Sequence, residues 1–163
     1  MLVVLSVARL NDLSERVWIG LIIVMLASFA VILAYMASVL GYMGPSLEGP
    51  YSVDEVGEAL EPGVRYLGDG VYEVNIIGRQ WIWNPREINV KDPKLIIFRI
   101  TSIDVIHGFQ IVDTNINVMV IPGYVTVVKW VPPDGLEGRL LIICNEYCGY
   151  GHQAMYGYLV IEG

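Results

Sequence analysis

The sequence predicts a single membrane-spanning helix followed by an all-β domain folded as a sandwich or barrel. The helix is indicated by the 31 residues between Arg16 and Glu48, which include no Asp, Glu, Lys or Arg. The β domain is indicated from Val64 onward, where short runs rich in Val, Ile and aromatic residues alternate with Gly, Pro and Asp. Charged residues make up only 17% of the 163 residues, against about 25% in typical soluble domains. This composition excludes a simple soluble enzyme, and the abundant apolar residues exclude a disordered chain.

The apolar run Val17–Leu40 is long enough to cross a membrane. As a helix, its 24 residues would span about 36 Å, compared with about 30 Å for the hydrocarbon core. Trp18 and Tyr42 lie near its two ends, where aromatic residues favour the membrane interface. A cleaved signal peptide is the alternative, but its apolar region would be only about 7–15 residues long, followed by small residues. Because this run is longer and carries Tyr35 and Met36 near its end, we expect a retained anchor.

The distribution of basic residues sets the expected orientation of this anchor. Arg9 and Arg16 precede it, whereas the first basic residue after it is Arg65. Basic flanks stay preferentially on the cytoplasmic side of a membrane. We therefore expect residues 1–16 in the cytoplasm, the transmembrane helix at residues 17–42, and the larger part of the chain on the outer face of the cell membrane.

The part beyond the anchor is expected to consist of a connection and a domain. Residues 43–63 begin with several Gly and Pro residues, which indicates a linker, and Ser52–Leu60 has apolar residues at the spacing of a short helix. Residues 64–163 are expected to form the β domain. The net charge of −7 lies entirely on the chain from Glu48 onward, which argues against a nucleic-acid partner. The candidate strands are Val71–Ile77, Glu87–Val90, Leu95–Thr101, Gly108–Val112, Asn117–Ile121, Tyr124–Trp130, Arg139–Cys144 and Tyr156–Ile161.

A short segment near the C-terminus concentrates the residues that bind soft metal ions. Cys144, Cys148, His152 and Met155 follow one another within twelve residues, and the second histidine of the chain, His107, lies 37 residues before Cys144. The two Cys and two His of the whole sequence are therefore confined to one segment and one upstream position. Thiolate, imidazole and thioether ligands together favour copper and disfavour Mg²⁺ or Ca²⁺.

Four kinds of site are compatible with these residues. A Cys144–Cys148 disulfide would suit an oxidising outer domain, but it leaves the histidines and Met155 without a role. A Cys₂His₂ zinc site usually places its ligands in close pairs, and methionine is a poor zinc ligand. A blue site with one copper needs two His, one Cys and a weak axial Met, which leaves one Cys over. Two copper ions bridged by both sulfurs use all the residues, so the ligand types favour this last site and leave the others open.

The segment CNEYCGYGHQAM resembles the binuclear copper A motif of cytochrome c oxidase subunit II, C-x-E-x-C-x-x-x-H-x-x-M. The similarity extends to TSIDVIHGF around His107, to NINVMVIPG, and to the aromatic segment Arg79-Gln80-Trp81-Ile82-Trp83. With one helix ahead of the domain, the chain is similar to the short subunit II of the B family of prokaryotic oxidases.

This resemblance implies a cupredoxin-like Greek-key sandwich or barrel and a complete ligand set. A metal site filled by protein ligands has no open position for a substrate, unlike a catalytic one, so we expect no catalytic residue in this chain. The implied copper ligands are the bridging thiolates of Cys144 and Cys148, the imidazoles of His107 and His152, the thioether of Met155 and the backbone carbonyl of Glu146.

The resemblance also implies a role as the electron-input subunit of a proton-translocating haem-copper oxidase. The copper A centre would accept electrons from a soluble donor, cytochrome c or a small copper protein, and pass them to haem in the membrane-embedded subunit I. Trp81 and Trp83 are candidates for a part in electron transfer, and packing in a core or an interface is the plainer alternative. A stand-alone, membrane-tethered copper carrier and a copper-storage or copper-delivery domain are the competing functions.

Overall fold

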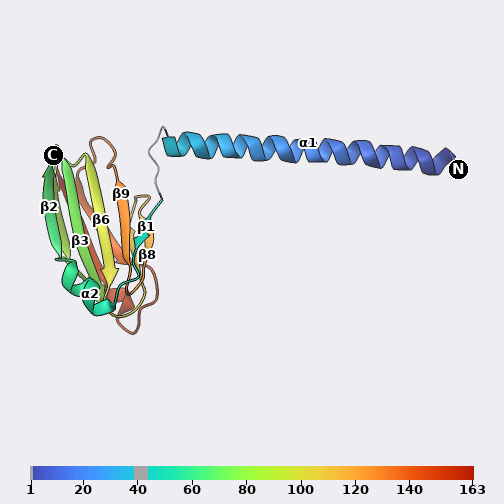
Figure 1. Cartoon of the computed structure of the whole chain (residues 1–163). Helices are drawn as coiled ribbons and strands as arrows, with labels where there is room; N and C mark the ends of the chain where they lie inside the picture. Colours follow the sequence, from blue (N-terminus) through green and yellow to red (C-terminus); the bar gives the residue numbers. More distant parts are fainter. Residues whose placement is uncertain (1, 39–43) are drawn as a thin grey trace. The chain divides into compact units, whose positions relative to one another are not determined.

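The computed structural model describes residues 2–38 and 44–163. The chain divides into two compact units, residues 1–43 and 44–163 (Figure 1). The first consists of the N-terminal helix, and the second contains all the described strands. Each unit is described by itself below.

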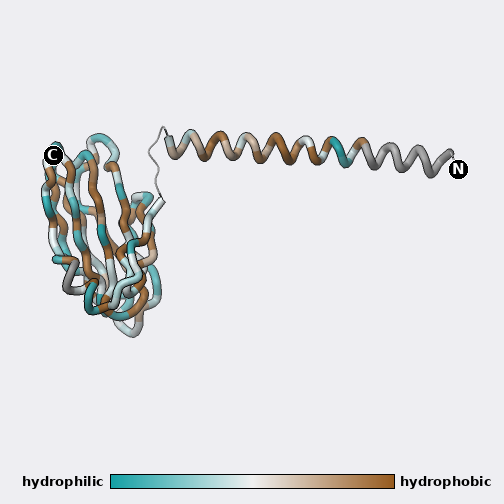
Figure 2. The backbone as a smooth tube through the Cα atoms, viewed as in Figure 1, coloured by the Kyte–Doolittle hydropathy of each residue, from teal (hydrophilic) through white to brown (hydrophobic). Residues whose placement is uncertain are grey.

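Helix α1 runs from Leu2 to Ser38. Its part from Leu13 to Ser38 is long and apolar enough to cross a membrane, with a mean hydropathy of 2.8 over the most apolar window, and brown segments dominate this part of the helix in Figure 2. The helix therefore begins well before Val17, because no Pro or Gly interrupts residues 2–16. The expected end of the anchor, with Leu40 and Tyr42, lies outside the described residues.

The second unit is a sandwich of two β-sheets, with the chain crossing repeatedly from one sheet to the other. This is the cupredoxin-like, all-β arrangement that the sequence predicts. In spatial order, the first sheet contains β1 (Ser46–Glu48), β9 (Val125–Trp130), β6 (Leu95–Ser102), β3 (Val71–Arg79) and β2 (Gly63–Gly68), with β4 (Ile82–Asn84) paired to β3. The second contains β5 (Glu87–Lys91), β11 (Tyr156–Glu162), β10 (Gly138–Cys144), β7 (His107–Ile111) and β8 (Asn117–Val120).

All eight predicted strands are present, with ends that differ by at most two residues from the predicted ones. The sequence did not predict β1, β2 or β4. Strands β1 and β4 have only three residues each, too few to show an alternating pattern. Strand β2 lies at the edge of its sheet with most of its side chains exposed, so it lacks the apolar face that marks a strand in sequence.

The core lies between the two sheets and is built from alternate residues of their strands. In β3, β6 and β7, for example, Ile76, Phe98 and Phe109 are completely buried, and the Phe98 and Phe109 rings pack with centroids 6.0 Å apart. Burying one such side chain stabilises a fold by about 1.5–3 kcal/mol. The unit of residues 44–163 thus has its own core, as an independently folding domain requires.

Helix α2, from Val53 to Ala59, forms where the sequence predicts a short helix. A capping box starts it: the Ser52 hydroxyl accepts a hydrogen bond from the Glu55 amide (3.2 Å), and the Glu55 carboxylate accepts one from the Ser52 amide (3.0 Å). Val56 then packs with Val125 and Val127 of β9. The helix therefore closes the outer face of the first sheet without reaching the main core.

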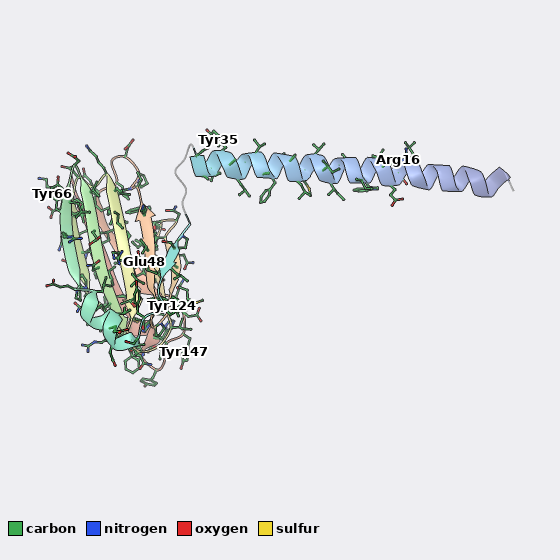
Figure 3. All side chains as sticks on the ribbon, viewed as in Figure 1. Arg16, Tyr35, Glu48, Tyr66, Tyr124 and Tyr147 are labelled. Carbon is green, nitrogen blue, oxygen red and sulfur yellow. The ribbon has the colours of Figure 1, made fainter. Side chains whose placement is uncertain are left out.

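The strand ends bring distant parts of the sequence to one end of the sandwich. Cys144, the last residue of β10, lies on the strand next to β7, which begins at His107, and Cys144 is paired with Phe109. Strand β11 starts beside the same end, since Tyr156 pairs with Ile143. Figure 3 shows Tyr147, from the β10–β11 connection, at one end of the domain and Tyr66 at the other.

Candidate metal centre

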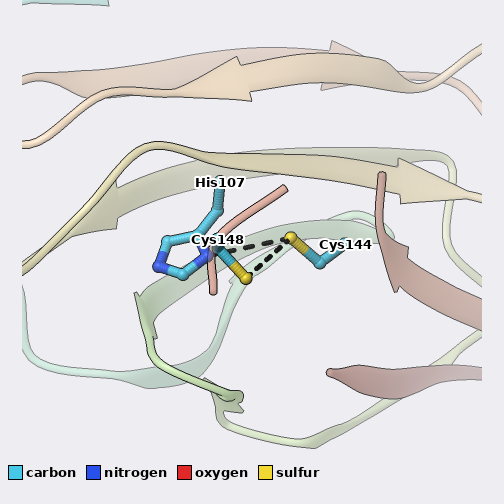
Figure 4. Close-up of side chains that lie close together, drawn as sticks. All are labelled: His107, Cys144 and Cys148. Atoms are coloured by element: carbon cyan, nitrogen blue, oxygen red, sulfur yellow. Dashed lines mark hydrogen bonds between the residues drawn. The ribbon is translucent and has the colours of Figure 1, made fainter. Parts of the chain in front are cut away.

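His107, Cys144 and Cys148 form a buried cluster at this end of the domain. The Nδ1 atom of His107 lies 3.7 Å from Sγ of Cys144, and the two cysteine sulfurs are also 3.7 Å apart (Figure 4). All three side-chain donor atoms lie within 4.8 Å of one another, and all three residues are buried. Neighbouring strands fix two of these residues and the following loop supplies the third, so the cluster follows directly from the strand register.

The other predicted ligands close the cluster from the β10–β11 connection. The Sγ atom of Cys148 lies 3.6 Å from Nδ1 of His152 and 3.8 Å from Sδ of Met155. The backbone carbonyl of Glu146 faces Sγ of Cys144 at 3.2 Å. The ends of the connection are joined by a hydrogen bond from the Cys144 amide to the Met155 carbonyl (3.2 Å). The structure therefore gathers all six residues that the sequence singled out for metal binding.

The chemistry of these donors fits copper. Both cysteines are free thiols, and both histidines turn the same ring atom, Nδ1, toward a cysteine sulfur. The cluster thus contains two thiols, two imidazoles and a thioether. These are soft and intermediate ligands of the kind that select copper. A structural zinc ion takes four ligands in a tetrahedron and would leave part of this set unused.

Comparison with known proteins identifies the relatives of this chain. No family model matches it. It is 36% identical to cytochrome c oxidase subunit 2 of Thermus thermophilus over 155 residues, which cover 91% of each chain. It is 40% identical to a second Thermus thermophilus protein of that name over 115 residues, covering 69% of this chain and 84% of the relative. This chain belongs to the cytochrome c oxidase subunit 2 family.

A solved structure agrees with this family assignment. A chain in the structure of a heme-copper terminal oxidase dimer is similar with a TM-score of 0.75 and 29% sequence identity, over 91% of this chain and 99% of that one. The fold of this chain is thus similar to that of an oxidase chain over most of its length. The helix and the family together fit a single-pass membrane protein, and the His and Cys cluster fits a copper site.

In this subunit 2 chain, the metal-free thiols have unlike acidities. Burial opposes ionisation of Cys144, but hydrogen bonds from His107 and from backbone amides outweigh it and lower its pKa to about 6. Burial and the neighbouring Cys144 sulfur raise the pKa of Cys148 to about 12. Two thiolates this close in a buried site repel each other. A bound cation removes that repulsion and allows both sulfurs to be thiolates.

Asp104 holds the imidazole of His107 from behind. Its Oδ1 atom lies 2.9 Å from Nε2 of His107, while the amides of Gln80 and Val105 donate to its carboxylate, each at 2.6 Å. Burial opposes ionisation of this carboxyl, but these donors and the His107 ring lower its pKa below the usual value. A carboxylate on the far nitrogen fixes the ring orientation and leaves Nδ1 for the metal. Sequence reasoning missed this role, although an Asp three residues before a ligating His was the available signal.

The two tryptophans proposed for electron transfer lie in different environments. Trp83 is only 1% exposed and packs edge-on against Phe109 and His107, with centroids 5.2 and 5.7 Å away. Its contacts are those of a core residue that also supports a ligand. Trp81 is 40% exposed. It covers the β10–β11 connection, residues 145–155, which we call the ligand loop, and a Cβ at Gly151 of this loop would overlap its ring. Only Trp81 therefore combines surface exposure with contact to the ligand loop.

Proposed function

We propose that this chain is the electron-input subunit of a respiratory haem-copper oxidase and that its metal centre is the binuclear copper A site. The observation that carries the proposal is the pair of cysteine sulfurs 3.7 Å apart, each in contact with a different imidazole. When bound, two copper ions that share two thiolates would supply a one-electron redox centre with the charge spread over both metals. Family membership supports the same conclusion.

The residues have distinct parts in this proposal. Cys144 and Cys148 would bridge the two ions, and His107 and His152 would each bind one of them. The Met155 thioether and the Glu146 carbonyl would be the weak outer ligands, one for each ion. This division agrees with the contacts, because Cys144 faces the Glu146 carbonyl and His107, while Cys148 faces Met155 and His152.

The protein around the site is suited to passing electrons rather than to binding a substrate. The strands β7 and β10 and the Asp104 hydrogen bonds constrain the positions of the ligands, so a change of charge would require little movement. His107, both cysteines and Met155 are buried, which excludes water from the sulfurs. Since protein ligands would fill the coordination positions, oxygen reduction would take place elsewhere.

The partner that reduces oxygen is proposed to be a haem-containing subunit I in the membrane. The sequence has two histidines, and this site uses both, so histidine-ligated haem needs another chain. The electron donor would be a soluble cytochrome c or a small copper protein. In this arrangement the N-terminus of the helix is cytoplasmic and the domain lies on the outer face of the cell membrane. A stand-alone copper carrier with the same site would need no such partner, and the family does not favour it.

Metal stoichiometry tests the nature of the site. The domain of residues 44–163, which has its own core, is loaded with copper and analysed by metal content and electron paramagnetic resonance. We expect two copper ions per chain and, in the mixed-valence state that holds one unpaired electron, a hyperfine pattern from two equivalent copper nuclei. One copper per chain with a single-nucleus pattern would show a blue copper site, and an intact Cys144–Cys148 disulfide in the copper-treated protein would exclude both.

A further inference from the structure

The turn between β3 and β4 contacts both segments that carry metal ligands. Its residue Gln80 donates a backbone hydrogen bond to Oδ2 of Asp104 (2.6 Å) and a side-chain hydrogen bond from Nε2 to the carbonyl oxygen of Cys148 (2.6 Å). Asp104 in turn contacts the His107 ring. Gln80 thus connects the β6–β7 loop, which leads to His107, with the β10–β11 loop, which contains Cys148.

The ligand loop is shaped to receive this turn. Gly149 follows Cys148 and has φ +117°, and a Cβ there would lie 2.9 Å from Nε2 of Gln80. At Gly151, a Cβ would overlap the ring of Trp81. A Cβ at Gly149 would displace the Gln80 side-chain amide from the Cys148 carbonyl, and a Cβ at Gly151 would displace the Trp81 ring. The close approach of Gln80 and Trp81 to the loop therefore depends on glycine at both positions.

We propose that Gln80 is a positioning residue of the metal centre. Its side chain connects the Cys148 segment to the Asp104–His107 segment, and so fixes the position of the Cys148–His152 pair relative to the Cys144–His107 pair. This inference rests on the proposed copper function for its consequence, whereas the contacts of Gln80 are observed directly. While the Gln80 side chain is bonded to the Cys148 carbonyl, the ligand loop would keep one conformation when the metal centre gains or loses an electron.

The hydrogen bond to the Cys148 carbonyl requires a neutral donor on a side chain as long as that of glutamine. The Cys148 carbonyl can only accept, so the side-chain amide of Gln80 can bind it whereas a carboxylate would be repelled. The backbone bond from Gln80 to Asp104 does not depend on the side chain. A substitution at Gln80 therefore removes the connection to Cys148 and leaves the support of His107 intact. This separation makes the role of the side chain measurable.

The test compares Gln80→Leu and Gln80→Glu with wild type and with Gln153→Leu in the full chain in detergent. Gln153 is an exposed glutamine of the ligand loop, so its substitution is a matched control. In the metal-free protein we expect amide hydrogen exchange of residues 145–151 to be about three- to tenfold faster in both Gln80 variants, as the loss of one net hydrogen bond predicts. The control and the melting temperature of the domain should stay close to wild type.

Copper-loaded protein gives the second readout. Copper should be lost to an excess of chelator about three- to tenfold faster from the Gln80 variants, with a changed reduction potential and unequal hyperfine couplings of the two ions. Wild-type values for exchange, copper loss and potential in both Gln80 variants would overturn the proposal. If wild type itself fails to bind two coppers, the proposed function fails, and the exchange comparison in metal-free protein still decides whether Gln80 ties the loop.

Discussion

The two histidines of the metal centre sit in contrasting surroundings. His107 begins a central strand, is completely buried, and has Asp104 and Trp83 behind its ring. His152 lies in the short 3₁₀ helix η1 (His152–Ala154) and is only partly buried. Its ring packs 5.9 Å from that of Tyr147, which is 76% exposed. One half of the site is therefore built on core strands, and the other half is built on a loop whose His152 lies near solvent although its Cys148 is buried.

This contrast suggests different roles for the strand half of the site, His107 and Cys144, and for its loop half, Cys148 and His152. The strand half keeps the position of His107 and Cys144 through the same packing that stabilises the domain. In the loop half, Cys148 also packs in the core, but His152 and the exposed Tyr147 beside it lie at the surface. A relay site benefits from both properties, since it needs fixed ligands and a short path to the surface.

The largest effect is expected at the contact between the halves. Cys148 faces Cys144, His152 and Met155, so Cys148→Ser should abolish the two-copper state and leave at most one copper per chain. The reason is that an alcohol oxygen does not replace a bridging thiolate as a soft ligand. Metal analysis and electron paramagnetic resonance of the variant check this expectation. Two coppers with a shared electron in Cys148→Ser would show that this sulfur is not a bridge.

The second prediction compares how much His107 and His152 each contribute to the stability of the protein without copper. His107→Ala should lower the free energy of unfolding by about 2–4 kcal/mol, because it leaves a cavity in the core and removes the partner of Asp104. His152→Ala should lower it by less than about 1 kcal/mol, since its ring is near the surface. Urea unfolding of the two variants without copper gives both values. Equal losses would mean that the loop half is as much a part of the core as the strand half.

The third prediction concerns the support of His107. Asp104→Asn should weaken copper binding by about 10–100-fold, the usual cost of losing a carboxylate behind a ligating histidine. An amide also cannot accept all the hydrogen bonds that the carboxylate accepts from Gln80 and Val105. Competition with a chelator measures the affinity. Asp113→Asn, at the exposed turn that follows β7, is the control, and an equal change in both variants would remove the special role of Asp104.

The smallest effect is expected at the weak ligand. Met155→Leu keeps a similar volume at a buried position, which should change the free energy of unfolding by less than about 1.5 kcal/mol. The variant should retain two coppers and change mainly the reduction potential, because a thioether tunes a copper site more than it holds the metal. Loss of copper as complete as in Cys148→Ser would show that Met155 is a principal ligand.

The sequence was sufficient to single out the residues that lie together in the candidate metal centre and to locate most of the strands. With two Cys and two His in the whole chain, few combinations were possible, and the alternation of apolar residues located the buried strands. The short strands β1 and β4 carry no such pattern. The extension of α1 to Leu2 was also missed, because the membrane segment was defined by its apolar residues rather than by the absence of a helix stop.

The residues that support the site were much harder to predict. Gln80 reaches Asp104 across 24 residues and Cys148 across 68, and no periodicity or spacing in the sequence indicates such contacts. They arise only when β3, β6 and β10 end at the same place in space. The different environments of Trp81 and Trp83 have the same origin, since Trp83 belongs to β4 and packs into the core, whereas Trp81 lies in the turn before that strand.

The central claim is that this chain delivers electrons to a haem-containing partner, and isolation of the native assembly tests it most directly. The tagged full chain is extracted from its native membrane in mild detergent, and haem content, donor oxidation and oxygen consumption are measured in the isolated fraction. We expect a larger, haem-containing membrane subunit to accompany the chain, with oxygen consumed as a reduced soluble donor is oxidised. Recovery of a haem-free chain, with the full oxidase activity left in the other fractions, would contradict the account and favour the stand-alone carrier.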